Sequence, residues 1–346
     1  MRYSPSRNES MRTILRRELR AKISLAILLL LAIGTRIAFS QESSSNYLGT
    51  YSIIARDPQT NQLGEGVQSK AFAAGNRAMT ARGGLAIIAH QAAANPLYGV
   101  LGMQLLSRGM SPEKALETML RSDKNRDRQQ VSILDINGRS IAWTGKGAKD
   151  WKGHKCGPNY CVQGNILVGA EVLEALILSF ESSKGPLAER LLDALDAAQA
   201  TGGDARGMQS AALLVVKPIT TSDDFDDRVV DLRVDDNPMP LKELRRLLNL
   251  QRSDEIIRQG SVDLTQGRLS KALERAILAQ QKSPNNDNVW MFLASVHLQL
   301  NEKDSALKAI QRAVKLNPAN TRNLLQNDLF DSIQSDPVFL KILANH

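Results

Sequence analysis

Thr50 is the residue whose type and position could do chemistry with the fewest helpers. A threonine hydroxyl is a weak nucleophile, but a free α-amine, with a reference pKa of about 7.7–8.0, can accept its proton at neutral pH. Thr50 would therefore carry its own base if the chain were cut after Gly49, a small residue typical of self-cleavage or trimming sites. The alternative is that Thr50 only opens a strand, since threonine is common in strands.

A first group of polar residues could complete such a site. His90 and Gln91 end an apolar strand pattern, and Asn95, Tyr98 and Gly99 lie in the segment that follows. We assign His90 and Asn95 to catalysis and Gln91 and Tyr98 to substrate binding, because asparagine and backbone N–H groups can donate hydrogen bonds to an oxyanion. The alternative is a tight turn between a strand and a helix, with no chemical role.

A second group lies further along the chain. Gln163 and Asn165 are predicted to face a substrate, and Asp204, Arg206 and Gln209 are further candidates for substrate binding. Asp204 and Arg206 could clamp a substrate carboxylate or form a salt bridge that braces a loop. The brace is the favoured interpretation.

Cys156 and Cys161 flank strong turn formers, and an oxidising compartment would let them form a disulfide. Free thiols are the second possibility. A metal site with His154 is the third, but two thiols and one imidazole leave a structural zinc site one ligand short. We expect a disulfide, His154 in a solvated loop, and neither a metal nor a cofactor.

The first 40 residues resemble a secretory signal: a basic segment, the apolar run 23–34 and a small-x-small cleavage site at 38–40. The run is short for a membrane span, so we expect cleavage after Ser40, an exported protein (periplasmic or secreted) and no stable membrane span afterwards. An uncleaved anchor is the alternative. This segment holds eight basic and two acidic residues and thus most of the net charge of +8. The nearly neutral remainder does not indicate nucleic-acid binding.

A chain of 346 residues with 42% hydrophobic residues is long enough for two folded units. The pattern predicts strands at 50–55, 63–69, 84–89, 129–135, 140–144, 160–162 and 211–216, and helices at 98–108, 111–120, 170–182 and 186–200. Groups of strands alternate with groups of helices, which indicates an α+β domain with helices stacked outside antiparallel sheets. The polar stretch 220–240 is predicted to be a connector.

The C-terminal region repeats every 34 residues. Segment 253–286 aligns with 287–320, so that Pro284 matches Pro318 and Gly260 matches Ala294. Small residues at fixed helical positions let paired helices pack closely, which resembles the tetratricopeptide repeat. Residues 321–346 resemble a capping helix pair. The alternative is a generic pair of helical hairpins.

Five blocks of sequence resemble the family known as domain of unknown function 1028, of the N-terminal nucleophile hydrolase superfamily. They are TYSIIARDP (50–58), HQAAANPLYGVLGMQLL (90–106), QGNILVG (163–169), GGDARGMQSAALLVV (202–216) and DLRVDD (231–236). The resemblance implies a four-layer αββα fold and hydrolysis of amide bonds. In that family the threonine commonly follows the initiator methionine, whereas here residues 41–49 would remain after signal cleavage. A second cut is therefore required.

The expected organisation is a signal peptide (1–40), a pro-segment (41–49), a hydrolase-like domain (50–218), a connector with the family's C-terminal tail (219–250) and helical repeats (251–346). The first hypothesis is an exported hydrolase of a small amide or peptide, whose repeats bind a protein or peptide partner or form a homo-oligomer. The rival is a non-catalytic binding protein with an inactive hydrolase-like core.

Overall fold

The computed structural model describes residues 49–219 and 227–344. The predicted signal segment and nearly all of the predicted pro-segment lie outside the described residues. Among the described helices, none combines the length and the apolar character that crossing a membrane requires.

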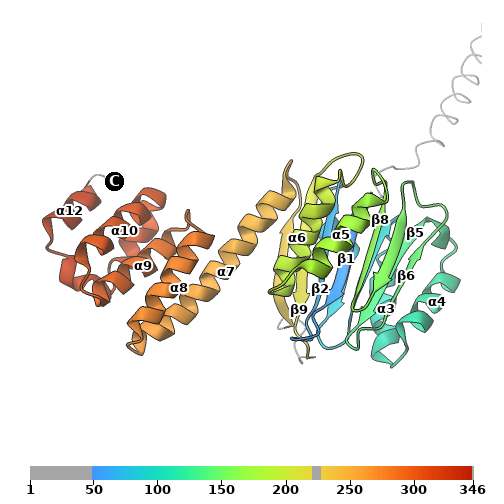
Figure 1. The fold of residues 1–346 in the computed structure, drawn as a ribbon, viewed down its shortest axis with the longest axis horizontal. Helices are drawn as coiled ribbons and strands as arrows, with labels where there is room; N and C mark the ends of the chain where they lie inside the picture. Colours follow the sequence, from blue (N-terminus) through green and yellow to red (C-terminus); the bar gives the residue numbers. More distant parts are fainter. Residues whose placement is uncertain (1–48, 220–226, 345–346) are drawn as a thin grey trace, which may run out of the picture. The chain divides into compact units, whose positions relative to one another are not determined.

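A six-stranded antiparallel sheet forms the middle of the N-terminal domain (Figure 1). Its order is β10-β9-β2-β1-β8-β7. The strands are β1 (Thr50–Arg56), β2 (Leu63–Ser69), β7 (Gly153–Gly157), β8 (Tyr160–Asn165), β9 (Ser210–Val216) and β10 (Arg228–Val234). The predicted hairpin around Asp57-Pro58 is present, and it pairs Thr50 with Ser69.

The second sheet has four antiparallel strands in the order β3-β4-β5-β6. They are β3 (Met79–Arg82), β4 (Ala86–Ala92), β5 (Gln129–Asp135) and β6 (Ser140–Thr144). The predicted turn at Asn137-Gly138 joins β5 to β6, with Gly138 at a φ of 81°, where glycine meets no steric penalty.

Helices cover the outer face of each sheet. Helices α5 (Glu171–Ser182) and α6 (Leu187–Ala200) share one apolar cluster with β1, β8 and β9, while α3 (Leu97–Ser107) and α4 (Pro112–Ser122) share another with β4 and β5. The short helix α2 (Ala74–Ala78) precedes β3. Ile54, Leu63, Ile87 and Leu134 belong to a third cluster, which both sheets form together. The layers therefore run from helices through two facing sheets to helices.

Alternation along β2 assigns each side chain to one layer. A Cβ added at Gly64 would lie 2.7 Å from Leu191 Cδ1, and one added at Gly66 would lie 3.1 Å from Leu195 Cδ1. These glycines therefore let α6 pack closely on β2. Leu63 and Val67 point the other way, toward the second sheet. Glu65 lies between them and therefore also points between the sheets.

Glu65 is a buried acid in this apolar layer. Its side chain is fully buried, and neither carboxyl oxygen has a hydrogen-bond partner among the described residues. Its neighbours across the sheet are Ile54 and Leu214. Burial alone raises the pKa of Glu65 well above its usual value, so the carboxyl is held in its neutral form.

We predict that replacing Glu65 with leucine raises the free energy of unfolding at pH 7 by about 1–3 kcal/mol, because a buried polar group without partners costs about that much. Since the folded-state pKa of Glu65 is raised, a second, pH-dependent penalty is absent below the ordinary glutamate value of about 4.3 and grows as pH rises toward the folded pKa. Urea unfolding across this pH range measures both effects. Glu65→Gln is the control that removes only the pH dependence, and no gain from Glu65→Leu would contradict this description of the layer.

Among the described α-helices and strands of the N-terminal domain, α2, β3, β7 and β10 were not predicted. The interpretation of 220–240 as a connector is wrong in part, because β10 lies there and pairs with β9 along the sheet edge. The alternating polar residues of β10 reflect a strand whose side chains are partly exposed. His154 lies on β7, where it pairs with Gln163, and not in the predicted loop.

The C-terminal region is all helical, as predicted. It contains α7 (Pro240–Thr265), α8 (Leu269–Lys282), α9 (Asp287–Gln299), α10 (Lys303–Leu316), α11 (Pro318–Leu324), the 3-10 helix η3 (Asp328–Ile333) and α12 (Pro337–Ala344). A Cβ at Gly260 would lie 2.6 Å from Phe292 Cζ, which shows why a small residue stands at this repeat position.

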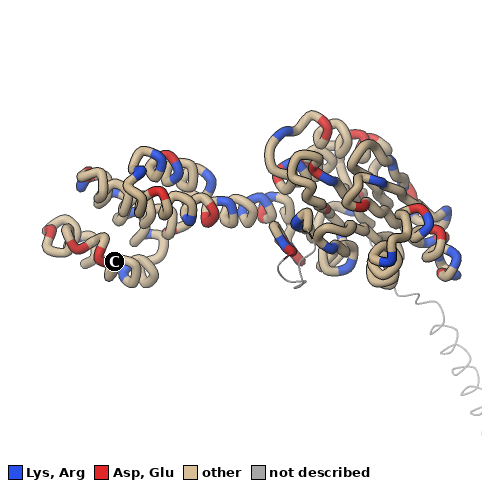
Figure 2. The backbone as a smooth tube through the Cα atoms, turned by 90° about the horizontal axis from the view of Figure 1, so that it is seen from below, with Lys and Arg blue, Asp and Glu red and all other residues tan. Residues whose placement is uncertain are grey.

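Helix α7 also belongs to the N-terminal domain. Its first half contacts α6, β9 and β10, and Leu241, Leu244 and Leu248 enter the apolar cluster beneath α6. Arg245 of α7 pairs with Asp193 at 2.7 Å and with Asp196, both on α6. Basic and acidic residues are intermixed along the described chain (Figure 2). The segment 240–250 is thus a packed helix and not a free connector.

Candidate functional site

Thr50 begins the strand that lies between β2 and β8. It pairs with Ser69 on one side and with Asn165 on the other, and its side chain is fully buried. The next residue, Tyr51, packs with α6 in the outer cluster, so the alternation of the strand turns Thr50 toward the second sheet. The Thr50 hydroxyl donates a hydrogen bond of 3.0 Å to Ser69 Oγ.

The carbonyl oxygen of Gly49 sits between two donors. Arg206 Nη2 donates to it at 3.0 Å, and Ser69 Oγ donates a short hydrogen bond to it. We call these two groups the Ser69–Arg206 donor pair. They are placed to stabilise negative charge on this oxygen, whose carbonyl carbon is bonded to the backbone nitrogen of Thr50.

Arg206 is fixed by Asp204. Two guanidinium nitrogens, Nε and Nη2, donate to the carboxylate at 3.0 and 2.8 Å, and the backbone N–H of Lys70 donates to the same carboxylate at 3.1 Å. Asp204 is buried, and its charge balances that of Arg206. The pair therefore acts as the brace that the sequence favoured. Because Asp204 already balances its charge, Arg206 is better suited to donate a hydrogen bond to a neutral carbonyl oxygen than to bind a substrate carboxylate.

A group of side-chain amides from both sheets lies beside the main chain of Thr50. Gln91 Nε2 donates to the Thr50 carbonyl at 3.2 Å and to Gln130 Oε1 at 2.8 Å. Asn165 Nδ2 donates to the same Gln130 oxygen at 3.1 Å, and Ser52 Oγ donates to Gln91 Oε1 at 2.8 Å. These contacts tie β1, β4, β5 and β8 together beside Thr50.

Backbone strain gathers at the same end of the sandwich. Seven described residues other than glycine have positive φ, and three of them are asparagines, which tolerate this conformation. The other four are Ala73, Ala92, Ala94 and Ile166. They lie at or after the ends of β2, β4 and β8, and these strand ends lie near Thr50 through its pairing with Ser69 and Asn165 and its contact with Gln91. Strain of this kind costs about 1–3 kcal/mol per residue and is concentrated at functional sites.

His90 was predicted to act with Thr50, but it lies on the opposite face of β4 from Gln91. Its Nε2 is 3.0 Å from Thr80 Oγ1, and a Cβ on Gly99 of α3 would lie 3.0 Å from the same nitrogen. Burial lowers the pKa of His90 to about 4. The prediction failed because adjacent strand residues point to opposite faces.

Asn95 and Tyr98 belong to a separate small cavity of about 230 Å³. Asn95 Oδ1 accepts a hydrogen bond from the N–H of Leu97 at the start of α3, and the Tyr98 hydroxyl donates to Asp123 at 3.1 Å. Gln209 lies apart, where it donates to Asp236 at 3.1 Å. The alternative turn role therefore fits Asn95 better than a catalytic one.

Gln163 lies in the layer between the sheets, opposite Ser52 on β1. Both polar atoms of its side-chain amide are buried and lack a partner among the described residues, as does Asn165 Oδ1. Buried polar groups are nearly always hydrogen-bonded, so these atoms are unsatisfied donors and acceptors with which a water or a ligand atom could pair.

Cys156 and Cys161 form a disulfide that joins β7 to β8. The described residues contain no cluster of histidine, cysteine or acidic side chains that could hold a metal ion. His154 instead contacts Thr144, its Nδ1 lying 2.8 Å from the threonine hydroxyl oxygen.

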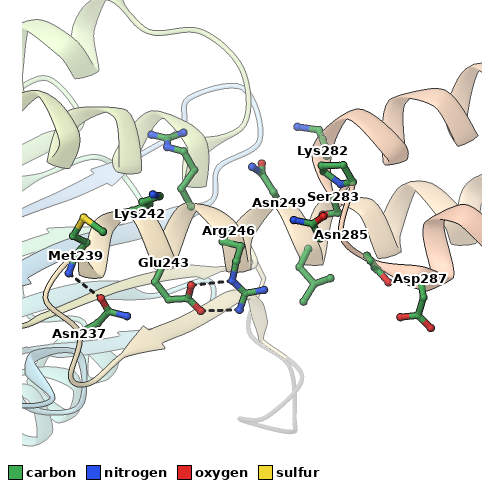
Figure 3. A pocket seen from close by; sticks show the side chains of 14 residues that line it. Asn237, Met239, Lys242, Glu243, Arg246, Asn249, Lys282, Ser283, Asn285 and Asp287 are labelled. Carbon is green, nitrogen blue, oxygen red and sulfur yellow. Dashed lines mark hydrogen bonds and ion pairs between the residues drawn. The ribbon is translucent and has the colours of Figure 1, made fainter. Parts of the chain in front are cut away.

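Two larger cavities lie in the helical region. One, of about 760 Å³, is lined mainly by the first half of α7 and the turn between α8 and α9, with the Glu243–Arg246 ion pair on its wall (Figure 3). The other, of about 410 Å³, lies among α7, α9 and η3 and has an apolar floor that includes Met291, Phe292 and Phe330. None of the predicted site residues lines either cavity.

Ser52, Ser69 and Gln130 were missed by the sequence interpretation. Ser69 could have been found, because the predicted hairpin 50–55/63–69 brings its two ends together. Gln130 gave no such signal, because it is one of two successive glutamines and only the sheet pairing shows which of them points inward.

The chain belongs to a family described as a family of unknown function (DUF1028), whose profile matches residues 50–244. A tetratricopeptide repeat profile matches residues 263–325. The chain is also similar to the crystal structure of protein SPO2555 from Silicibacter pomeroyi, titled as DUF1028. That match has 31% identity and a TM-score of 0.53, and it covers 58% of this chain and 84% of the other. No curated protein gives a significant match.

Removal of the Arg206 side chain is predicted to lower the free energy of unfolding by about 1–3 kcal/mol, because the buried Asp204 carboxylate loses its charged partner. Arg206→Lys should recover part of this loss, since lysine keeps the charge but lacks the two-pronged geometry. Denaturant unfolding measures both variants.

The matched control is Arg233→Ala, which breaks a more exposed pair with Asp231 and should cost less than about 1 kcal/mol. Equal losses at the two positions would contradict the bracing role of Arg206.

Proposed function

We propose that the protein is an exported amide hydrolase of the N-terminal nucleophile type, with Thr50 as the nucleophile after removal of the residues before it. The observation that carries this proposal is the Gly49 carbonyl, which the Ser69–Arg206 donor pair holds next to the Thr50 hydroxyl. The two facing sheets with helices outside support assignment to this superfamily, and the disulfide suits an oxidising compartment.

The cut before Thr50 is proposed to be intramolecular. Thr50 Oγ attacks the carbonyl carbon of Gly49, and the donor pair stabilises the negative oxygen. Ser69 Oγ, which accepts a hydrogen bond from the Thr50 hydroxyl, is placed to receive the Thr50 proton and pass it to the leaving nitrogen. The C–N bond breaks, the Thr50 nitrogen takes the proton, and Gly49 remains as an ester on Thr50 Oγ. Water then hydrolyses this ester and releases the pro-segment.

The freed amine would then serve as the base for substrates. It takes the proton from Thr50 Oγ, which attacks the carbonyl carbon of a substrate amide. The substrate oxygen would occupy the place that Gly49 oxygen holds in the structure, within reach of Ser69 and Arg206. The leaving amine receives the proton, and water hydrolyses the acyl ester. The side-chain amides of Gln91, Gln130 and Asn165 would keep the Thr50 main chain in place during both steps.

Intact mass measured during incubation of the purified protein tests this proposal. We predict that a form beginning at Thr50 accumulates, that Thr50→Ser still produces it, and that Thr50→Ala does not. Ser69→Ala should slow processing by about 10²-fold or more, the effect of losing one oxyanion donor. Efficient cutting of Thr50→Ala would show that another protease makes the cut and would exclude the intramolecular step.

A screen of N-acyl amino acids, small amides and short peptides tests turnover itself. Processed wild type should hydrolyse at least one class, with Thr50→Ser retaining part of the activity. If no substrate is turned over by verified processed protein, the rival function as a non-catalytic binding protein is favoured.

The helical repeats are proposed to bind a protein or peptide partner, and the cavity of about 410 Å³ with its apolar floor is the observation that favours this. A peptide array probed with wild type and Leu329→Ser tests it, because Leu329 lines the cavity and is 40% exposed. Binding should weaken in Leu329→Ser but not in the control Leu340→Ser, whose side chain is 52% exposed and does not line this cavity. Equal loss in both variants would place the binding elsewhere.

A further inference from the structure

Gln130 is at the centre of the amide group beside Thr50. Its side chain is fully buried, and its Oε1 accepts hydrogen bonds from Gln91 Nε2 at 2.8 Å and from Asn165 Nδ2 at 3.1 Å. Gln91 in turn donates to the Thr50 carbonyl at 3.2 Å. The orientation of the Gln130 amide therefore decides whether Gln91 Nε2 has a second acceptor besides the Thr50 carbonyl.

The other end of the amide has its own partners. Gln130 Nε2 donates to Thr144 Oγ1 at 2.9 Å and lies within 3.0 Å of the carbonyl oxygens of Gly153 and Gly164. These groups come from β6, β7 and β8. An amide flip would place the oxygen of Gln130 against two carbonyl oxygens, so the observed orientation is strongly favoured.

Thr144 connects Gln130 to the surface. Its hydroxyl oxygen accepts from Gln130, which leaves its own hydrogen free to point at His154 Nδ1, 2.8 Å away. In this direction Nδ1 is the acceptor, which corresponds to a neutral His154 with its proton on Nε2. A chain of hydrogen bonds thus runs from exposed His154 through Thr144, Gln130 and Gln91 to Thr50.

We propose that Gln130 is a positioning residue for Thr50 and that Thr144 couples Gln130 to the protonation of His154. The proposal rests on the proposed function, because it assigns a role beside a nucleophilic Thr50. Protonated His154 would present Nδ1–H to the Thr144 hydroxyl. The hydroxyl hydrogen would then have to turn away, and Gln130 Nε2 and the imidazolium would both donate to the same oxygen, which changes the hydrogen bond of the Gln130 amide.

The surroundings of His154 leave it free to respond to pH. Strand β6 contributes no charged side chain, and on β8 the residue opposite His154 is Gln163. Tyr160 of β8 and the acidic residues of α5 lie on the helix-covered face of the sheet. The nearest charged residue to His154 in the sequence is Lys155. Burial lowers the pKa of His154, so its titration falls below the ordinary value of about 6.5.

Side-chain amide resonances of Gln91 and Gln130, followed by NMR from pH 7.5 to 4.5, test the proposal without any substrate. In wild type both should shift with the same midpoint as the His154 ring. Thr144→Val, which keeps the shape but lacks the hydroxyl, should abolish the shift, and Thr144→Ser should restore it. His154→Phe, a surface change, should also abolish it.

The proposal would be overturned if the Gln91 and Gln130 resonances did not shift as His154 titrates. It would also be overturned if they shifted equally in Thr144→Val. Because the readout needs no hydrolysis, an inactive Thr50 with the coupling intact would count against the proposed function alone.

Discussion

The pairing register of β1 determines what surrounds Thr50. β2 sets Ser69 opposite Thr50, and β8 sets Asn165 opposite it from the other side. A slip of one residue would turn every side chain of β1 to the other face, so that Thr50 would point toward α6 and Tyr51 toward the second sheet. Both faces of the strand are buried, so the apolar packing of Ile53 and Ile54 in two different clusters holds this register.

The hairpin and the helical repeats could be predicted from the sequence because each rests on local rules. Asp57-Pro58 and Asn137-Gly138 mark turns by their own conformational preferences, and the 34-residue period shows in the spacing of small residues. The position of Thr50 at the start of β1 follows from the same rules. So does its pairing with Ser69, once the hairpin is drawn to its full length.

The rest of the site depends on contacts between distant strands. His90 and Gln91 are adjacent, and only the pairing of β4 with β5 and the position of α3 show that Gln91 faces Thr50 while His90 does not. Strand β7 is short and partly exposed, so its sequence gives no apolar pattern, yet it places His154 beside Thr144. Long-range pairing of this kind has no signature in a single sequence.

Selective oxidation of the N-terminal residue tests directly whether Thr50 becomes the first residue of the active chain. Periodate cleaves the 1,2-amino alcohol of an N-terminal threonine and leaves internal threonines intact. The proposed function predicts that peptide mapping of incubated, periodate-treated protein finds a glyoxylyl group at position 50, and that Thr50→Ala protein lacks it. Protein that hydrolyses an amide while its chain still begins ahead of Gly49, with no periodate-sensitive terminus, would contradict the assignment of Thr50 as nucleophile and base.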